Sequence, residues 1–235
     1  MMVKKIYMAA LLVLCLAGGA DGAEITADVL TYNGETKVAR AEGDVVIHGD
    51  EGEVLTGAAG EYRFNDKSAW MNGGVHYTKG ATSLAAAEVT LAGDKTLHGT
   101  GGVEIHDGEN TLTGSTVTYN PDTGYGVVDG NGYISMPDGN VAAPHIEGNL
   151  KGIRITATGG VHITSDVHQL DATSDEAVYT KTPNADDGHV TLSGNAAATQ
   201  NGNTITGPEL DIRLNDNFVE TKGRSTLVIT NTAPQ

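Results

Sequence analysis

Cysteine is nearly absent from this sequence, whose 235 residues include only Cys15. A single cysteine allows neither a disulfide within the chain nor a metal site built from several thiolates. Cys15 follows Leu14 within an apolar run, whereas a lipidated cysteine follows a small residue. We therefore expect an unlipidated chain whose fold depends on packing and hydrogen bonds alone.

Long apolar runs are also missing, with one exception near the N-terminus. Two lysines there precede an apolar run over residues 8–17 and a group of small residues, which is the order of a secretory signal peptide. The run is too short to span a bilayer. We expect cleavage after Ala20 or Ala23, which makes residues 1–23 the signal peptide, removes the cysteine and places the exported chain in the periplasm.

Aromatic and basic residues are scarce. Phe, Trp and Tyr make up 5% of the chain, and 14 Lys and Arg stand against 30 Asp and Glu, for a net charge of −16. A surface this acidic repels phosphate backbones, which excludes nucleic acids as partners. The acidic residues are scattered along the chain, as is typical of a solvated surface.

Glycine, in contrast, is abundant, with 32 residues in the chain. Together with frequent Thr, Val and Ile it favours strands joined by tight turns. Turn-forming sequences such as Asn33-Gly34, Asp107-Gly108 and Asn201-Gly202 recur throughout. After the signal peptide no segment keeps a helical apolar period over three turns, so we expect an all-β chain.

The chain repeats itself. Seven units of about 28–30 residues can be aligned on an element that resembles Leu-Thr-Gly, and a second element that resembles Gly-x-Val recurs in the later half of each unit. One longer step is explained by a polar insertion at residues 183–188. Each unit supplies about two strands, so residues 24–235 are predicted to form one domain of roughly 14–16 antiparallel strands.

Side chains alternate along the strand that begins at the Gly-x-Val element, which predicts one buried and one wet face. The predicted inner row is Val45, Ile47, Val75, Tyr77, Val103, Ile105, Val161 and Ile163. In the fourth unit we align Asn131-Gly132 with the glycine pairs, which puts Tyr133 and Ser135 at the inner positions. Trp70, the only tryptophan, is expected in the core.

The best copy of the repeat runs from Ile25 to Ile47. It reads Ile-Thr-Ala-Asp-x-Leu-x-Tyr, a turn, and then Ala-x-Gly-Asp-Val-x-Ile. This pattern resembles the OstA-like family, which includes the lipopolysaccharide-transport protein LptA and the N-terminal domain of LptD. The resemblance implies an open β-jellyroll with no catalytic residues and no cofactor.

The resemblance also implies a function and partners. Acyl chains of lipopolysaccharide or a similar glycolipid would lie between the sheets, against the inner row. The expected protein partners are other envelope lipid-transport proteins with OstA-like domains and further copies of the chain, joined head to tail. The strand edges at the two ends of the stack are the surfaces for such contacts.

Two alternatives compete with this interpretation. His48, His76, His106 and His162 fall at outward positions and could line up as a metal site, but outward histidines in a sheet are more often solvated cross-strand neighbours, and we predict no metal. The second alternative is a structural or adhesive envelope β-solenoid with a packed interior and no lipid. The small number of bulky residues favours a groove over a filled interior.

Overall fold

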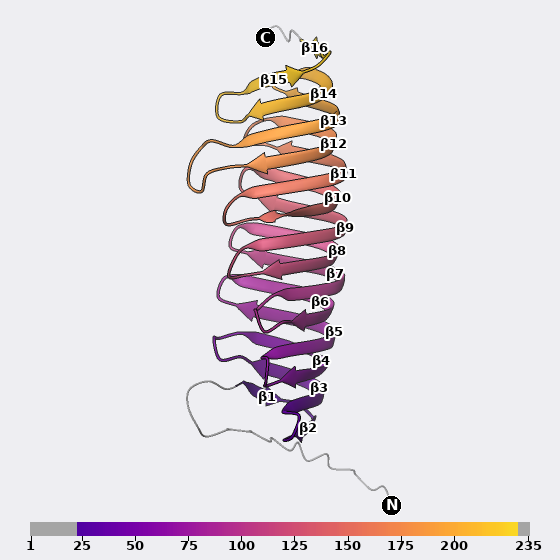
Figure 1. The fold of residues 1–235 in the computed structure, drawn as a ribbon, viewed down its shortest axis with the longest axis vertical. Helices are drawn as coiled ribbons and strands as arrows, with labels where there is room; N and C mark the ends of the chain where they lie inside the picture. Colours follow the sequence, from indigo (N-terminus) through magenta and orange to yellow (C-terminus); the bar gives the residue numbers. More distant parts are fainter. Residues whose placement is uncertain (1–22, 230–235) are drawn as a thin grey trace, which may run out of the picture.

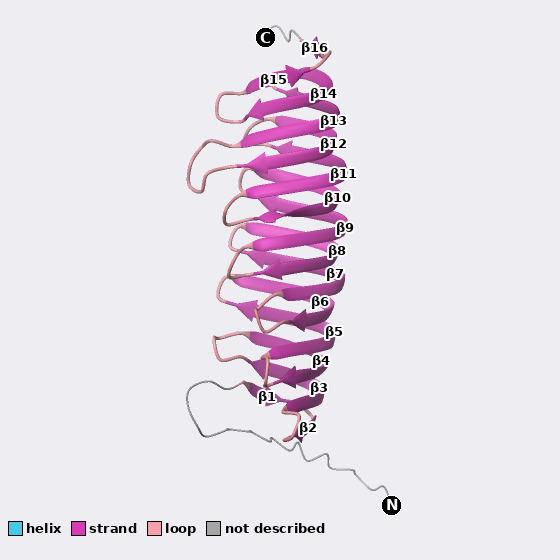
Figure 2. Cartoon of the chain, viewed as in Figure 1, coloured by secondary structure: helices cyan, strands magenta, loops and turns pink. Residues whose placement is uncertain are grey.

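The computed structural model describes residues 23–229, so the predicted signal peptide lies outside the described residues. These residues form 16 strands in one antiparallel sheet, which confirms the all-β prediction (Figures 1 and 2). No helix within 23–229 is long and apolar enough to cross a membrane. The strands are β1 (Glu24–Thr26), β2 (Val29–Asn33), β3 (Val38–His48), β4 (Val54–Arg63), β5 (Ser68–Lys79), β6 (Thr82–Leu91), β7 (Leu97–Asp107), β8 (Asn110–Asn120), β9 (Tyr125–Met136), β10 (Gly139–Asn149), β11 (Arg154–Ser165), β12 (Leu170–Thr180), β13 (His189–Gln200), β14 (Asn203–Arg213), β15 (Phe218–Lys222) and β16 (Thr226–Val228).

The strand order follows the chain. From β3 to β15 each strand pairs with the next, while β1 and β2 both pair with β3, and β15 and β16 both pair with β14. The two ends of the stack are therefore formed by short strand pairs, each equivalent to one interrupted long strand. Seven repeats of two strands account for this arrangement, as the sequence predicts.

Each long strand bends near its middle, where its pairing with the neighbouring strand shifts. In β5 the shift lies between Asn72 and His76 against β4, and between Asn72 and Val75 against β6. The bends follow one long side of the stack and the hairpin loops follow the other, so each strand contributes to two layers (Figure 1). The result is an elongated core between two layers, open toward the loops.

Glycine makes the bends possible. Gly73 and Gly74 in β5 have φ angles of 85° and 79°, which are left-handed values that side chains disfavour. A Cβ atom on Gly73 would lie 2.4 Å from the Cβ of Ala58 in β4, whereas one on Gly74 would meet nothing within 4 Å. The glycine pair of the Gly-x-Val element is thus the corner of the strand.

The fourth unit departs from the predicted register by one residue. Its corner is Gly130-Asn131, with φ angles of 73° and 55°, rather than Asn131-Gly132. Ile134 is consequently buried and Tyr133 is exposed on the outer face, so the prediction that Tyr133 and Ser135 face inward is wrong. Asparagine tolerates the left-handed region better than other side chains do, so it can take the place of the second glycine.

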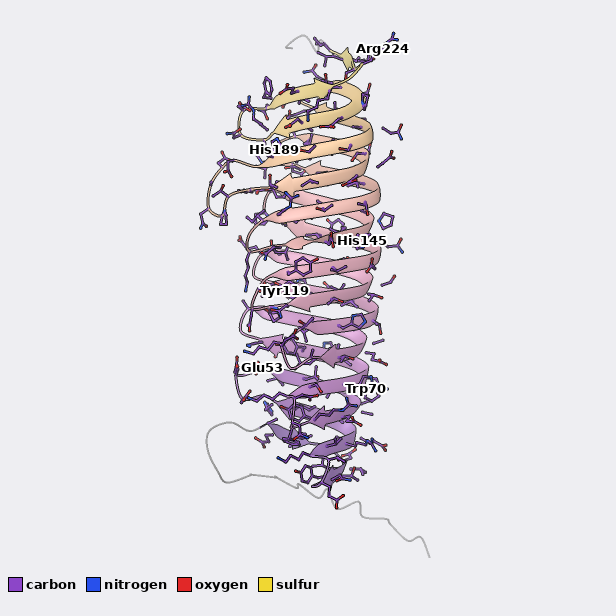
Figure 3. All side chains as sticks on the ribbon, viewed as in Figure 1. Glu53, Trp70, Tyr119, His145, His189 and Arg224 are labelled. Atoms are coloured by element: carbon purple, nitrogen blue, oxygen red, sulfur yellow. The ribbon has the colours of Figure 1, made fainter. Side chains whose placement is uncertain are left out.

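The predicted position of Trp70 is also wrong, because the side chain is 37% exposed. Its neighbours in β5, Ala69 and Met71, are both buried. Trp70 pairs across the sheet with Glu61 and Thr90 on the outer face, and it projects away from the stack (Figure 3). The two-residue alternation of the strand outweighs the tendency of a large aromatic side chain to be buried.

Candidate functional site

The interior is a single apolar core that runs the length of the stack. It extends from Ile25 in β1 to Leu214 after β14 without a break. All eight side chains of the predicted inner row belong to it, with at most 6% of any of them exposed. Their assignment to lipid binding stays a prediction.

Two pockets reach into this core. The first, of about 540 Å³, lies near the N-terminal end and is lined by apolar side chains that include Ile47, Leu55 and Tyr77. The second, of about 330 Å³, lies in the C-terminal half and includes Ile163 and Tyr179. The other members of the inner row line neither pocket and pack against their core neighbours.

The hairpin loops form two rows on the open side of the stack. Loops that join an odd-numbered strand to the next even-numbered one make the first row, and the remaining loops make the second row. The first row is residues 49–53, 80–81, 108–109, 137–138, 166–169 and 201–202, and the second is residues 34–37, 64–67, 92–96, 121–124, 150–153, 181–188 and 214–217. Access to the core from the open side passes between these rows.

Polar side chains at the edges of the two rows contact one another and close the core. We call these cross-row contacts the polar seam. Its members are Lys67–Asp50 (2.6 Å), Lys95–Glu51 (2.5 Å), Tyr119–Asp107, Tyr179–Asp138 (2.7 Å), Lys181–Asp138 (2.5 Å) and Gln200–Asn217 (2.8 Å). The seam covers the apolar interior with ion pairs and hydrogen bonds.

At the N-terminal end, the seam is a small network. Lys79 lies 2.9 Å from Glu53 and 3.2 Å from Glu51, and it reaches Asp122 across the seam at 3.8 Å. Burial lowers the pKa of Lys79, but its hydrogen bonds to Glu53 and Glu51 outweigh this and raise the pKa above the usual value. Hydrogen bonds from Lys95 and Lys79 lower the pKa of Glu51. Lys79 and Glu51 are therefore both charged at neutral pH.

Asp138 is the centre of the seam in the C-terminal half. Burial raises the pKa of this carboxyl, but hydrogen bonds from Lys181 and Tyr179 outweigh burial and keep the pKa below its usual value. Burial and the hydrogen bond to Asp138 both raise the pKa of the Tyr179 hydroxyl. The contact is a charge-assisted bond between an ammonium group, a carboxylate and a neutral phenol.

A groove interrupts the seam between Asp107 and Asp138. With the solvent at its mouth included it measures about 1250 Å³, and its lining has residues of both loop rows, among them Pro137, Leu150 and Ile153. Met136, Asp138 and Tyr179 line this groove and the 330 Å³ pocket alike. The Asp138 contacts therefore lie between the solvent-facing groove and the apolar interior.

Sequence reasoning missed the seam. The loop lysines look like ordinary solvated residues, yet Lys37, Lys67 and Lys95 recur at the repeat spacing and all have positive φ angles. The spacing was the available signal. The spacing does not identify the carboxylate that pairs with each lysine, because that carboxylate lies on the opposite loop row and comes close only when the strands bend at their corners.

The outward histidines lie where the alternation predicts, on the exposed outer face. His162 contacts Asp171 at 3.1 Å and His106 contacts Glu104 at 2.9 Å, both within the sheet surface. Within the described part of the chain, no group of three or more His, Cys, Asp or Glu residues is placed to hold a metal ion.

The comparisons with known proteins bear on this architecture. The family model for the LptA/(LptD N-terminal domain) LPS transport protein matches residues 54–218, which is well over half of the chain. The chain belongs to this family. The OstA-like resemblance is thereby confirmed, and the LptA/LptD family is one of transport proteins rather than enzymes.

Among the solved structures that match this LptA/LptD family member is one from a periplasmic lipopolysaccharide-transport component. It is LptH, described as the LptA homologous periplasmic component of the conserved lipopolysaccharide transport device from Pseudomonas aeruginosa. The two chains share 14% identity over 89% of this chain and 96% of LptH, with a TM-score of 0.22. No curated protein matches the chain.

Proposed function

We propose that this chain is a periplasmic carrier that holds the acyl chains of lipopolysaccharide, or of a similar envelope glycolipid, in its apolar interior. The proposal also includes a bridge between inner and outer membranes, formed by joining such domains end to end. The observation that carries the proposal is the unbroken apolar core along a stack that has its loops on one side. Membership of a lipopolysaccharide-transport family supports the choice of lipid.

The energetics favour acyl chains as the cargo. Each methylene moved from water to an apolar interior gains about 0.8 kcal/mol, so even part of one acyl chain supplies a large driving force. Sugars and phosphates of the glycolipid remain in solvent outside the seam. This arrangement suits a strongly acidic protein, because the repelled phosphates need not contact its surface.

Loading requires the polar seam to part. Its ion pairs are partly exposed, with 58% of the Lys67 side chain and 17% of the Lys181 side chain accessible. Such pairs contribute about 0–1 kcal/mol each, so acyl burial readily offsets their loss. The groove between Asp107 and Asp138 has residues of both rows in its lining and opens to solvent, so the rows can begin to separate there.

The two ends of the stack supply surfaces for assembly. β1 and β2 leave one edge unpaired at the N-terminal end, and β15 and β16 leave one at the C-terminal end. Val29 is 57% exposed at the first edge, and Leu227 and Val228 are similarly exposed at the second. An antiparallel strand from another copy or another OstA-like domain would extend the sheet and cover these side chains.

A second candidate function is a structural β-solenoid that holds no lipid. The observation in its favour is the packing of the interior, where the side chains of Val75, Ile105 and Leu112 are 0% exposed. In a lipid carrier, the two layers would separate when the contacts of the seam break and so make room for the acyl chains. The two accounts differ in whether inner positions ever contact lipid.

A photo-crosslinking amino acid at adjacent inner and outer positions tests the proposal in cells. The carrier account expects glycolipid adducts at Val75 and Val103 but none at the matched outward neighbours His76 and Glu104. Equal capture at inner and outer positions would indicate nonspecific contact. Absence of adducts at both inner positions, in a folded and exported protein, would leave the structural solenoid.

A further inference from the structure

Tyr77 differs from the other deeply buried tyrosines in what its hydroxyl does. The hydroxyls of Tyr119 and Tyr179 donate hydrogen bonds to Asp107 and Asp138 across the seam. The Tyr77 side chain is 0% exposed, and among the described residues its hydroxyl has no hydrogen-bond partner. Among residues 23–229 it is the sole buried side-chain nitrogen or oxygen atom without a hydrogen-bond partner.

An unpartnered hydroxyl in an apolar core is costly. A buried hydroxyl that loses its hydrogen bonds to water destabilises the folded state, and buried polar groups in proteins nearly always have partners. A phenylalanine would fill the same space at this position without that cost. The hydroxyl of Tyr77 is therefore a feature that packing alone does not explain.

The surroundings of Tyr77 indicate what could pair with it. The residue lines the 540 Å³ pocket, whose walls include Ile47, Leu55 and Leu91 and whose rim carries Glu53 and Lys95. A chain that enters between the loop rows passes the charged rim first and then the apolar walls. A matching ligand is thus mostly hydrocarbon, with one polar atom close to its charged end.

We propose that the Tyr77 hydroxyl recognises an oxygen substituent near the head of a bound fatty acyl chain, most simply a hydroxyl group. A hydroxyl fits because, like the phenol, it both donates and accepts a hydrogen bond. The pocket thereby selects hydroxylated acyl chains over plain ones. This inference rests on the proposed function, since it assumes that acyl chains reach the interior.

The test compares two fatty acids of equal length, one with a hydroxyl at the β carbon and one without. Binding to the exported chain is measured by displacement of a fluorescent fatty acid. The wild-type chain should bind the hydroxylated acid roughly three- to tenfold more tightly, the factor that one net hydrogen bond supplies. Tyr77→Phe should remove this preference by weakening binding of the hydroxylated acid alone.

Tyr119→Phe is the matched control, because it deletes a tyrosine hydroxyl that already has a partner. It should retain the preference for the hydroxylated acid. If Tyr77→Phe retains the preference too, or if the wild-type chain has none, the Tyr77 proposal is overturned while the carrier function stands. If neither acid displaces the fluorescent probe from a folded wild-type chain, the carrier function itself fails.

Discussion

The Tyr119 hydroxyl donates a hydrogen bond to Asp107, although the two residues belong to opposite ends of the β7–β8 hairpin. Tyr119 pairs with Leu97 at one end, and Asp107 pairs with Asn110 at the other. A flat hairpin of this length would separate them by about 30 Å at 3.3 Å per residue. The contact exists because both strands bend at their glycine corners, and it joins the two layers over the core.

Removing this bond should weaken the closure of the two layers. We expect Tyr119→Phe to lower the free energy of unfolding by about 1.5–3 kcal/mol, the range for a hydrogen bond to a charged group. Urea unfolding gives the value. Tyr133→Phe is the control, because Tyr133 lies on the outer face. The free energy of unfolding of this variant should be within about 0.5 kcal/mol of that of the parent chain. Equal effects would mean that the cross-row bond contributes nothing.

The corner glycines allow strain and steric clash to be separated. In Gly74→Ala the added Cβ meets no neighbour. The variant should lower the free energy of unfolding by about 1 kcal/mol, because only the strain of the left-handed backbone remains. Gly73→Ala should cost clearly more, because its Cβ would overlap that of Ala58. Adding Ala58→Gly should restore Gly73→Ala to roughly the stability of Gly74→Ala. A failure of this rescue in thermal unfolding would contradict the corner geometry.

Adjacent residues of β5 test the alternation. Val75→Asp should destabilise the fold by several kcal/mol, because a carboxylate without a partner would be buried in the core. His76→Asp adds the same group on the exposed face and should change stability by about 0.5 kcal/mol or less. Equal losses in the two variants would mean that the assigned register is wrong.

Part of this architecture is readable from the sequence and part is not. The glycine-valine spacing and the alternation after it predict the strand pairs and place Val75 inside and His76 outside. They fail at Asn131, where an asparagine takes the conformation of a glycine, and at Trp70, where size suggested burial. The seam is beyond such reasoning, because its contacts depend on two layers that form only after each strand bends.

Alkaline pH should destabilise the protein through Tyr77. Burial raises the pKa of its hydroxyl from 10.0 to about 12. Because the folded-state pKa is the higher one, the contribution to stability is complete below pH 10 and is lost as pH rises from about 10 to 12. Tyr77→Phe should show a shallower decline over this window and no loss of stability at neutral pH. An unchanged slope would argue against a buried Tyr77 hydroxyl.

Salt should accelerate lipid loading if the seam is the barrier. The Debye length falls from about 10 Å at 0.1 M to about 3 Å at 1 M, which weakens the partly exposed pairs. Lys181→Gln should load faster at low salt and respond less to added salt. Lys222→Gln is the control, since Lys222 pairs with Glu209 at 2.6 Å away from the seam. A loading rate that is independent of salt in the parent chain would contradict this role.

Native mass spectrometry of the protein purified from its own envelope tests the central claim most directly. The carrier account predicts a population whose mass exceeds that of the exported chain by one glycolipid, and fragmentation that releases acylated, phosphorylated sugar. The parallel outer-face variant His76→Asp should carry the same adduct. A folded protein found only at its bare polypeptide mass, under conditions that preserve adducts of a known lipid carrier, would contradict the account.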